Sequence, residues 1–249
     1  MNGTAPACPI RVVSMVDAVE RRRAFAARAG VAPVEWSFFD AKTGLVEGLR
    51  HDAAAVERNK GRQLTRGEIG CYASHFAIWR EMIERGTRQC IVLEDDTIVD
   101  WAFVARLAAT DLAAEGIRYL RLYAKAPTFS RVVRRDFLHH SRAIIELVGH
   151  PYGTQGYMIT LAGARALAQA CATITRPIDD QMDRSWDHGV RNLALFPAPL
   201  IEEFVESGIG SARFAGTKSA AYRVPRQRLA RWIDRQRIRA KKLGLLRGR

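Results

Sequence analysis

Three consecutive carboxylates, Glu94, Asp95 and Asp96, directly follow the apolar run 90–93. The length and composition of that run predict a buried β-strand that ends at the acids. Adjacent acids repel one another and are costly to bury without a partner, so a cluster at the end of a strand calls for a cation or for strong hydrogen-bond donors. A hard divalent ion with oxygen ligands meets that need. The alternative is that the acids only cap the strand and open a loop.

The elements that would position these acids alternate between strand and helix along the chain. Apolar runs predict strands at 10–16, 34–39, 90–93, 119–123, 143–148 and 157–160. Helical spacing predicts helices at 17–29, 65–83, 103–114 and 162–171. Thr65, followed by Glu68 three residues later, predicts a capping box at the start of the second helix. This order predicts an α/β fold with a mostly parallel central sheet, in which ligands bind beyond the carboxyl ends of the strands.

The net charge of +13 is concentrated at the C-terminus, where residues 226–249 carry ten Lys and Arg against one acid, Asp234. We therefore predict one catalytic domain over residues 1–224 and a basic amphipathic tail over residues 225–249. Apolar residues fall near helical spacing in the tail, at Leu229, Trp232, Ile233, Ala240 and Leu243. Such a helix suits an anionic membrane surface, and the alternative is a helix packed on the body by its apolar stripe. Nucleic acid is not an expected partner, because the tail lacks aromatic interleaving and a recognisable binding motif.

The cysteines and the N-terminus bear on the compartment. Cys8, Cys71, Cys90 and Cys171 form neither a CxxC pair nor a Cys/His cluster at zinc-ligand spacing, which argues against a structural zinc site or a disulfide scaffold. The first nine residues lack an export signal, and about 18 consecutive apolar residues occur nowhere. We expect a cytoplasmic protein, peripheral on the inner face of the cytoplasmic membrane through its tail.

Several segments together carry a resemblance to a known family. Residues 64–75, LTRGEIGCYASH, followed by Ile78-Trp79 and then by residues 91–96, IVLEDD, closely resemble the central signature of glycosyltransferase family 25. That family includes bacterial lipooligosaccharide galactosyltransferases and animal collagen galactosyltransferases. Segments 12–15, 39–44, 153–159 and 177–179 resemble its flanking motifs, so the similarity covers roughly residues 10–199. One departure is Ser14, where the family commonly has an asparagine.

The resemblance implies a GT-A type fold, a nucleotide-sugar donor and an inverting transfer of a hexose. The acids would then be a DXD-like motif in which Asp96 and Glu94 hold Mn²⁺ or Mg²⁺. Such an ion offsets the negative charge that develops on the leaving diphosphate. Asp95 is expected either to bind the donor or to cap a loop.

Inverting transfer also needs a general base on the face opposite the leaving group. Asp179 and Asp180 are the candidates, and their alternative role is to cap a helix N-terminus. Asp183 and Asp187 are expected at the surface or in contact with the acceptor. Trp186 is expected either to stack on the acceptor sugar or to pack in the core.

The resemblance extends the donor site to residues from several segments. Ser74, His75 and Tyr157 have structural alternatives, because a lone polar residue on a helix usually satisfies the fold and a tyrosine can simply pack. The full set of expected donor-binding residues is Val13, Ser14, Arg21, Lys42, Gly44, Ser74, His75, Glu94, Asp95, Gly153, Thr154, Gly156 and Tyr157.

The function predicted from these residues is inverting transfer of a hexose, galactose or glucose, from a UDP-sugar. The acceptor is expected to be a lipopolysaccharide, a lipooligosaccharide or another glycan, free or lipid-linked. A metal-dependent phosphodiesterase or nuclease is the first alternative, although it lacks further acids and histidines at metal-ligand spacing. An inactive sugar-binding member of the same fold is the second.

Overall fold

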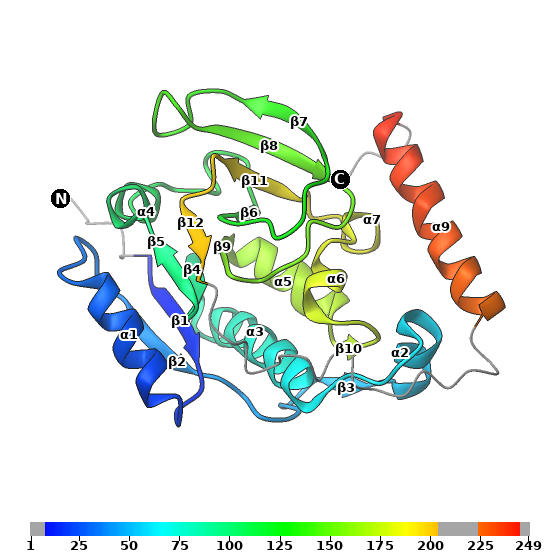
Figure 1. The fold of residues 1–249 in the computed structure, drawn as a ribbon. Helices are drawn as coiled ribbons and strands as arrows, with labels where there is room; N and C mark the ends of the chain where they lie inside the picture. The colour runs from blue at the N-terminus through cyan, green and yellow to red at the C-terminus, as the bar shows by residue number, and fades with distance from the viewer. Residues whose placement is uncertain (1–7, 204–223, 245–249) are drawn as a thin grey trace.

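The computed structural model describes residues 8–203 and 224–244. Its centre is an eight-stranded sheet in the order β2-β1-β4-β9-β6-β11-β8-β7 (Figure 1). Six of these strands run in one direction, and β9 and β8 run against them. The expected α/β class with a mostly parallel sheet is thus confirmed. The strands are β1 (Ile10–Ser14), β2 (Ser37–Asp40), β4 (Gln89–Glu94), β6 (Tyr119–Arg121), β7 (Phe129–Arg134), β8 (Ala143–Val148), β9 (Gly156–Thr160) and β11 (Leu193–Phe196).

Two further strand pairs lie outside this sheet. β3 (Arg50–His51) pairs with β10 (Thr173–Ile174), and β5 (Thr97–Val99) pairs antiparallel with β12 (Leu200–Glu202). The second pair follows the acids directly. It brings the backbone N–H of Glu203 to the carbonyl oxygen of Asp96, 2.7 Å away.

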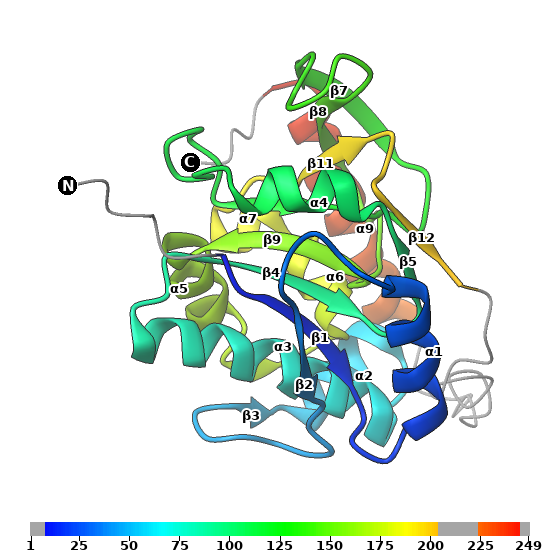
Figure 2. The ribbon, with the colours of Figure 1, turned by 90° about the vertical axis from the view of Figure 1, so that its left-hand side faces the viewer.

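Helices cover both faces of the sheet, and β4 shows how one strand serves both cores. Cys90 and Val92 point into the core beneath α3 (Arg66–Arg85) and α5 (Leu161–Ala170), whereas Ile91 and Leu93 point into the core beneath α1 (Val19–Ala29) and α4 (Trp101–Ala108). Figure 2 shows α3 and α5 together on one side of the sheet and α4 on the other. Because both faces of β4 are buried, its apolar residues run without alternation.

The predicted capping box of α3 is present. The Thr65 hydroxyl accepts the N–H of Glu68 at 3.2 Å, and the Thr65 N–H donates to the Glu68 carboxylate at 2.9 Å. Arg62 binds the same carboxylate with two nitrogens, at 2.7 and 2.6 Å. The helix then runs for 20 residues and ends at Gly86 in the left-handed conformation. It carries Ser74 and His75 to the sheet.

Four elements of the described structure, α4, β7, β11 and β12, differ from the sequence expectations. α4 ends at Ala108 rather than at 114, because Asp111 accepts the N–H groups of Ala113 and Ala114 and so forms a turn. β7 has no predicted counterpart, since all six of its residues are exposed and no apolar face marks it. β11 and β12 were not predicted either.

The basic tail contains helix α9 (Val224–Lys242), which lies at the edge of the molecule in Figure 1. It docks by polar side chains: Asp234 accepts two hydrogen bonds from Arg184, at 3.0 and 2.9 Å, and the Lys241 ammonium donates to Ser185 at 2.6 Å. Leu229 and Trp232 remain 56% and 53% exposed. The alternative of docking by the apolar stripe is therefore wrong. None of the helices in the described ranges is both long and apolar enough to cross a membrane.

The short helices α2 (Ala53–Lys60), α6 (Ile178–Met182) and α7 (Ser185–His188) complete the described elements. α6 begins directly at the predicted base candidates. Pro177 precedes it and Asp179 and Asp180 fill its first turn.

Candidate active site

Glu94 is the last residue of β4, and a chain of hydrogen bonds from α3 ends on its carboxylate. The indole N–H of Trp79, which can only donate, lies 3.0 Å from the Tyr157 hydroxyl oxygen, and that oxygen lies 3.0 Å from His75 Nδ1. His75 Nε2 lies 3.4 Å from Glu94 Oε1, to which Thr154 also donates its hydroxyl. Trp79 can only donate to the Tyr157 oxygen, which leaves the tyrosine proton available to His75 Nδ1, and His75 Nε2 faces Glu94.

This arrangement keeps Glu94 ionised. Burial by itself would raise the pKa of Glu94, but hydrogen bonds from His75 and Thr154 and the charge of Arg21 outweigh it, so that the pKa lies below its ordinary value. The expected donor residues His75 and Thr154 thus act on the acid cluster directly.

Asp95 is occupied by contacts with the end of β1 and with α1. Its carboxylate accepts a hydrogen bond from the Ser14 hydroxyl at 2.6 Å and forms an ion pair with Arg21. Its carbonyl oxygen accepts a hydrogen bond from the Arg28 guanidinium at 3.0 Å. The carboxylate is 2% exposed. The serine at the departure from the family pattern therefore has a structural partner, and Asp95 joins β4 to α1 rather than facing a ligand.

Asp96 has the opposite character. Its Oδ1 atom is buried and has no hydrogen-bond partner among the described residues. Burial, assisted by the nearby charge of Glu94, raises the pKa of Asp96 to about 7. A buried carboxylate oxygen without a donor is the observation that a bound cation would explain, so Asp96 fits the expected metal-ligand role.

A second set of possible metal ligands shares Glu94. Cys71, His75 and Glu94 are the one group of three in the described part of the chain whose ligand atoms all lie within 4.8 Å of one another. A thiol and an imidazole suit zinc, whereas carboxylate oxygens suit Mg²⁺ and Mn²⁺. The three side chains already contact protein partners, including Thr154 at 3.9 Å from the Cys71 sulfur.

The two base candidates have different environments. Asp179 is half-buried and accepts the N–H groups of Asp180 at 2.8 Å and Gly153 at 3.2 Å. Asp180 is buried against Lys60 Nζ at 2.9 Å and His150 Nδ1 at 3.6 Å. Burial would raise the pKa of Asp180, but Lys60 and the neighbouring cations lower it below its ordinary value. Asp180 is thus committed to ion pairing, and of the two Asp179 is the better placed to meet a substrate.

One two-residue segment contacts both carboxylate groups. The Gly153 N–H donates to Asp179, and the Thr154 hydroxyl donates to Glu94. Gly153 has φ +82°, and a Cβ there would collide with the Gln155 side chain. The loop before β9 therefore links the metal-ligand candidate in β4 to the base candidate in α6.

Sequence reasoning missed the residues that hold this loop. Arg121, 1% exposed, donates to the carbonyl oxygens of Tyr152 at 3.2 Å and Gly153 at 2.7 Å and pairs with Asp183. Asp183 is itself 1% exposed, so its expected surface position is wrong, whereas Asp187 is exposed as expected. The signal for Arg121 was available, because a charge inside an apolar strand needs a partner.

The expected donor loop is held by α3. The Lys42 N–H donates to the Ser74 hydroxyl at 2.8 Å, and that hydroxyl donates to the Gly70 carbonyl oxygen at 2.7 Å. Gly44 is exposed with no atom within 4 Å of where its Cβ would be. Val13, opposite Glu94 in the sheet register, is buried. Ser74 therefore positions the loop rather than facing a ligand.

Two expected donor contacts point into the core instead. Tyr157 is 0% exposed, so its ring packs and does not stack on a sugar. A Cβ at Gly156 would collide with Leu200 and lie 3.2 Å from Leu93, so the glycine is required by packing between β9 and β12. Neither residue is therefore the sugar contact that was expected, because the pleat of the sheet sets which way each residue of β9 faces.

Trp186 is half-buried in α7. The Arg184 guanidinium lies over its ring at 5.1 Å and the His150 ring meets it edge-on at 5.7 Å. Its indole nitrogen is buried and has no hydrogen-bond partner in the described residues. Its ring is thus covered by protein groups, which leaves little of it for stacking on an acceptor.

A family model that matches most of the chain shows the family to which it belongs. Residues 7–182 match the model of glycosyltransferase family 25 (LPS biosynthesis protein). The Bos taurus probable inactive glycosyltransferase 25 family member 3 is 34% identical over 115 residues, which cover 43% of this chain and 18% of that protein. The Xenopus laevis procollagen galactosyltransferase 1-B is 35% identical over 112 residues, 44% of this chain and 18% of that protein. The chain thus matches about a fifth of the length of these relatives. A solved structure of a glycosyltransferase involved in the glycosylation of the major capsid of PBCV-1 covers 66% of each chain, with 12% identity and a TM-score of 0.32.

Proposed function

Because the chain belongs to glycosyltransferase family 25, we propose that it transfers a hexose, galactose or glucose, from a UDP-sugar to a glycan acceptor with inversion of the anomeric centre. The acceptor is a lipopolysaccharide, a lipooligosaccharide or another glycan. Asp179 removes the proton of the attacking hydroxyl. The domain acts as a GT-A type nucleotide-sugar-binding fold.

The observation that carries this proposal is the segment Gly153-Thr154. Its backbone N–H reaches Asp179 and its threonine hydroxyl reaches Glu94. An inverting transfer needs one charged group beside the leaving diphosphate and a separate carboxylate beside the incoming hydroxyl. Two acids from distant segments, joined by one loop, supply this arrangement.

The diphosphate side would be served by a divalent ion held by Asp96 and Glu94. Mn²⁺ or Mg²⁺ would offset negative charge on the leaving UDP. The unpartnered oxygen of Asp96 supports this ligand in preference to Asp95, which is fully paired. Cys71→Ser separates the two possible metal sets. If Asp96 and Glu94 hold the ion, Mn²⁺-dependent turnover persists in Cys71→Ser and is lost in Asp96→Asn.

An inactive sugar-binding protein is the second candidate, and one comparison favours it. The Bos taurus relative at 34% identity carries the word inactive in its name. The candidates differ in a measurable way: an inactive member binds UDP without turning over a UDP-sugar.

Release of UDP from UDP-galactose and UDP-glucose, with Mn²⁺ or with EDTA, tests the proposal. We expect Mn²⁺-dependent formation of UDP and free hexose in the absence of acceptor, reduced about 10²- to 10⁴-fold in Asp179→Asn. Glu35→Gln, at an exposed acid on the surface, is the matched control and should keep full turnover. UMP and hexose 1-phosphate as products would identify a phosphodiesterase instead. UDP binding with no product would identify the inactive sugar-binding alternative.

We also propose that α9 attaches the protein to the inner face of the cytoplasmic membrane. Support comes from Leu229 and Trp232, which are 56% and 53% exposed on a helix rich in Arg and Lys, and from Leu243, which directly follows the helix and is 75% exposed. Sedimentation with phosphatidylglycerol vesicles, compared with phosphatidylcholine vesicles, measures the effect. Trp232→Ser should weaken binding to the anionic vesicles, whereas Val31→Ser, at a fully exposed apolar residue elsewhere, should not. Equal binding by both variants would refute the attachment.

A further inference from the structure

Tyr152 combines backbone strain with an exposed ring beside the base candidate. It is one of three non-glycine residues with positive φ in the described chain, at 54°, and the residue is 38% exposed. A bulky residue in this region costs of order 1 to 3 kcal/mol and persists only where its surroundings impose it. The fold therefore holds this ring in place at a cost.

The restraint is a buried ion pair. Asp183 accepts the Tyr152 N–H at 3.0 Å and pairs with Arg121, which donates to the Tyr152 carbonyl oxygen at 3.2 Å. Asn192 donates to Asp183 at 3.4 Å and accepts from Arg121 at 2.8 Å. Both charged side chains are at most 1% exposed. Burying two charges is costly unless their remaining hydrogen bonds are satisfied, and here the backbone on both sides of Tyr152 satisfies them.

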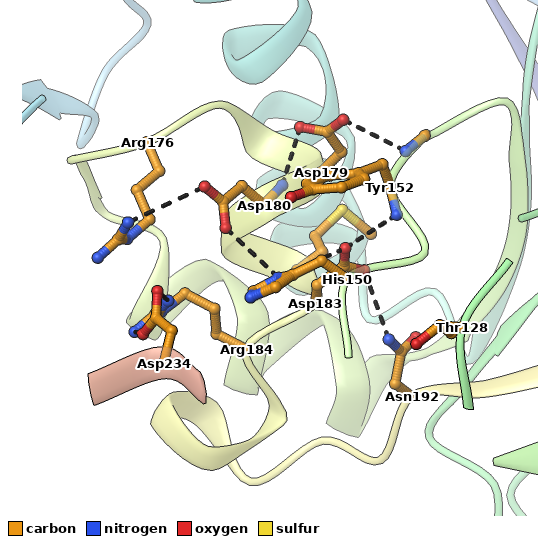
Figure 3. A network of polar contacts seen from close by, with 12 residues as sticks. Thr128, His150, Tyr152, Arg176, Asp179, Asp180, Asp183, Arg184, Asn192 and Asp234 are labelled. Atoms are coloured by element: carbon orange, nitrogen blue, oxygen red, sulfur yellow. Dashed lines mark hydrogen bonds and ion pairs between the residues drawn. The ribbon is translucent and has the colours of Figure 1, made fainter. Parts of the chain in front are cut away.

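The ring stands beside the base and in front of other aromatic groups. Figure 3 shows Tyr152 between Asp179 and His150. The His150 ring is stacked with Tyr152 at 5.7 Å with 18° between the planes, and it meets the Trp186 ring edge-on at 5.7 Å. The next residue, Gly153, donates its N–H to Asp179. Of the aromatic residues expected to meet a sugar, Tyr157 is fully buried and Trp186 is covered by Arg184, whereas Tyr152 is exposed, so Tyr152 has the ring that a ligand can reach.

We propose that Tyr152 is the platform on which the acceptor sugar packs, in place of Trp186. The apolar C–H face of a pyranose lies against the phenol ring, and a hydroxyl of that sugar is directed to Asp179. Arg121 and Asp183 are positioning residues that fix the ring and the Gly153 N–H as one unit. This inference rests on the proposed function and deepens it by assigning the acceptor side of the site.

The test uses the full chain and three soluble probes, the methyl β-glycosides of galactose, glucose and N-acetylglucosamine, each measured by saturation-transfer NMR in the presence of UDP. Tyr152→Gly removes the ring while its backbone adopts φ 54° without strain, so this variant should fold. We expect about tenfold weaker glycoside binding in Tyr152→Gly and wild-type binding in Tyr152→Phe, since the ring and not the hydroxyl makes the contact. Phe196→Ala, at a 62% exposed aromatic elsewhere, is the matched control and should bind as wild type.

The outcomes separate this inference from the proposed function. Wild-type glycoside binding by Tyr152→Gly overturns the platform, and so does a wild-type protein that binds none of the three probes. Loss of binding in Tyr152→Phe also overturns it, because the ring is retained. Release of UDP from UDP-galactose by the wild-type protein is measured separately, and its failure refutes the transferase proposal whatever the glycosides do.

Discussion

Gly70, in the interior of α3, gives a prediction whose sign depends on one contact. A glycine inside a helix is less favourable than alanine by about 0.5 to 1 kcal/mol, so helix propensity alone predicts that Gly70→Ala stabilises the protein. The structure predicts the reverse. A Cβ at Gly70 would lie well inside 3.0 Å of the Lys42 carbonyl oxygen, closer than real Cβ atoms come to another atom.

The size of the effect follows from what must move. The loop at Lys42 is anchored by its own N–H to Ser74 at 2.8 Å and by the Ala41 N–H to the Ser14 carbonyl oxygen at 2.9 Å. Accommodating the methyl group separates helix and loop by roughly 0.5 to 1 Å, and overpacking of this kind costs about 1 to 3 kcal/mol. A weakened hydrogen bond adds about 1 kcal/mol, which the gain in helix propensity offsets. The expected net loss in the free energy of unfolding is about 1 to 3 kcal/mol.

Urea unfolding followed by circular dichroism measures this change, and thermal unfolding should show a midpoint about 2 to 10 °C lower. Gly44→Ala is the matched control in the same loop, because no atom lies within 4 Å of its Cβ position and its φ is not positive. Its free energy of unfolding should be unchanged or slightly higher. A Gly70→Ala protein more stable than wild type would show that the helix and the loop do not approach as described.

Three further changes test separate parts of the structure. Thr65→Ala removes the N-cap of α3 and should cost about 0.5 to 2 kcal/mol in urea unfolding; no loss would mean that the box does not support the helix. Burial would raise the pKa of Glu146, but hydrogen bonds from Arg191 and Arg131 lower it below its ordinary value of 4.5. The ionised Glu146 therefore contributes its full stabilisation above pH 4.5, and this stabilisation is lost as the pH falls through the lowered pKa. Glu146→Gln should therefore flatten the acid limb of a plot of unfolding free energy against pH, and a limb as steep as in wild type would contradict this. Asp234→Asn weakens the pair with Arg184 and should speed hydrogen exchange in α9 while leaving the central sheet protected; unchanged exchange would show that the pair does not hold the helix.

The elements with a strong local signal were predicted from the sequence, and those defined by long-range pairing were not. The capping box at Thr65 and Glu68 depends on residues three apart, and it is present as expected. β7 has six exposed residues and exists because β8 pairs with it, so no periodicity in its own sequence marks it. A strand whose stabilisation comes from its neighbour cannot be recognised from its composition.

The candidate site divides in the same way. Glu94 and Asp96 follow an apolar run, and that local pattern is enough to locate them at the end of a strand. Tyr157 and Gly156 also lie in a recognisable segment, but their roles depend on which face of β9 they occupy. A shift of one residue in register would exchange the faces, and motif similarity does not fix the register. Resemblance located the segment, and packing decided which of its side chains are free to meet a ligand.

The loop that connects Glu94 to Asp179 shows most clearly what the sequence alone does not predict. Arg121 is a charged residue within the apolar run 119–123, and its burial would require an acidic partner. The sequence does not identify that partner, because several acids follow later in the chain. The fold selects Asp183, and through that pair it fixes the loop that reaches both Asp179 and Glu94. The positions of the two candidate carboxylates, Asp179 and Glu94, are thus linked by a residue that contacts neither of them. Substitutions at Arg121 should therefore disturb the metal-ligand candidate and the base candidate together, although the sequence places them in unrelated motifs.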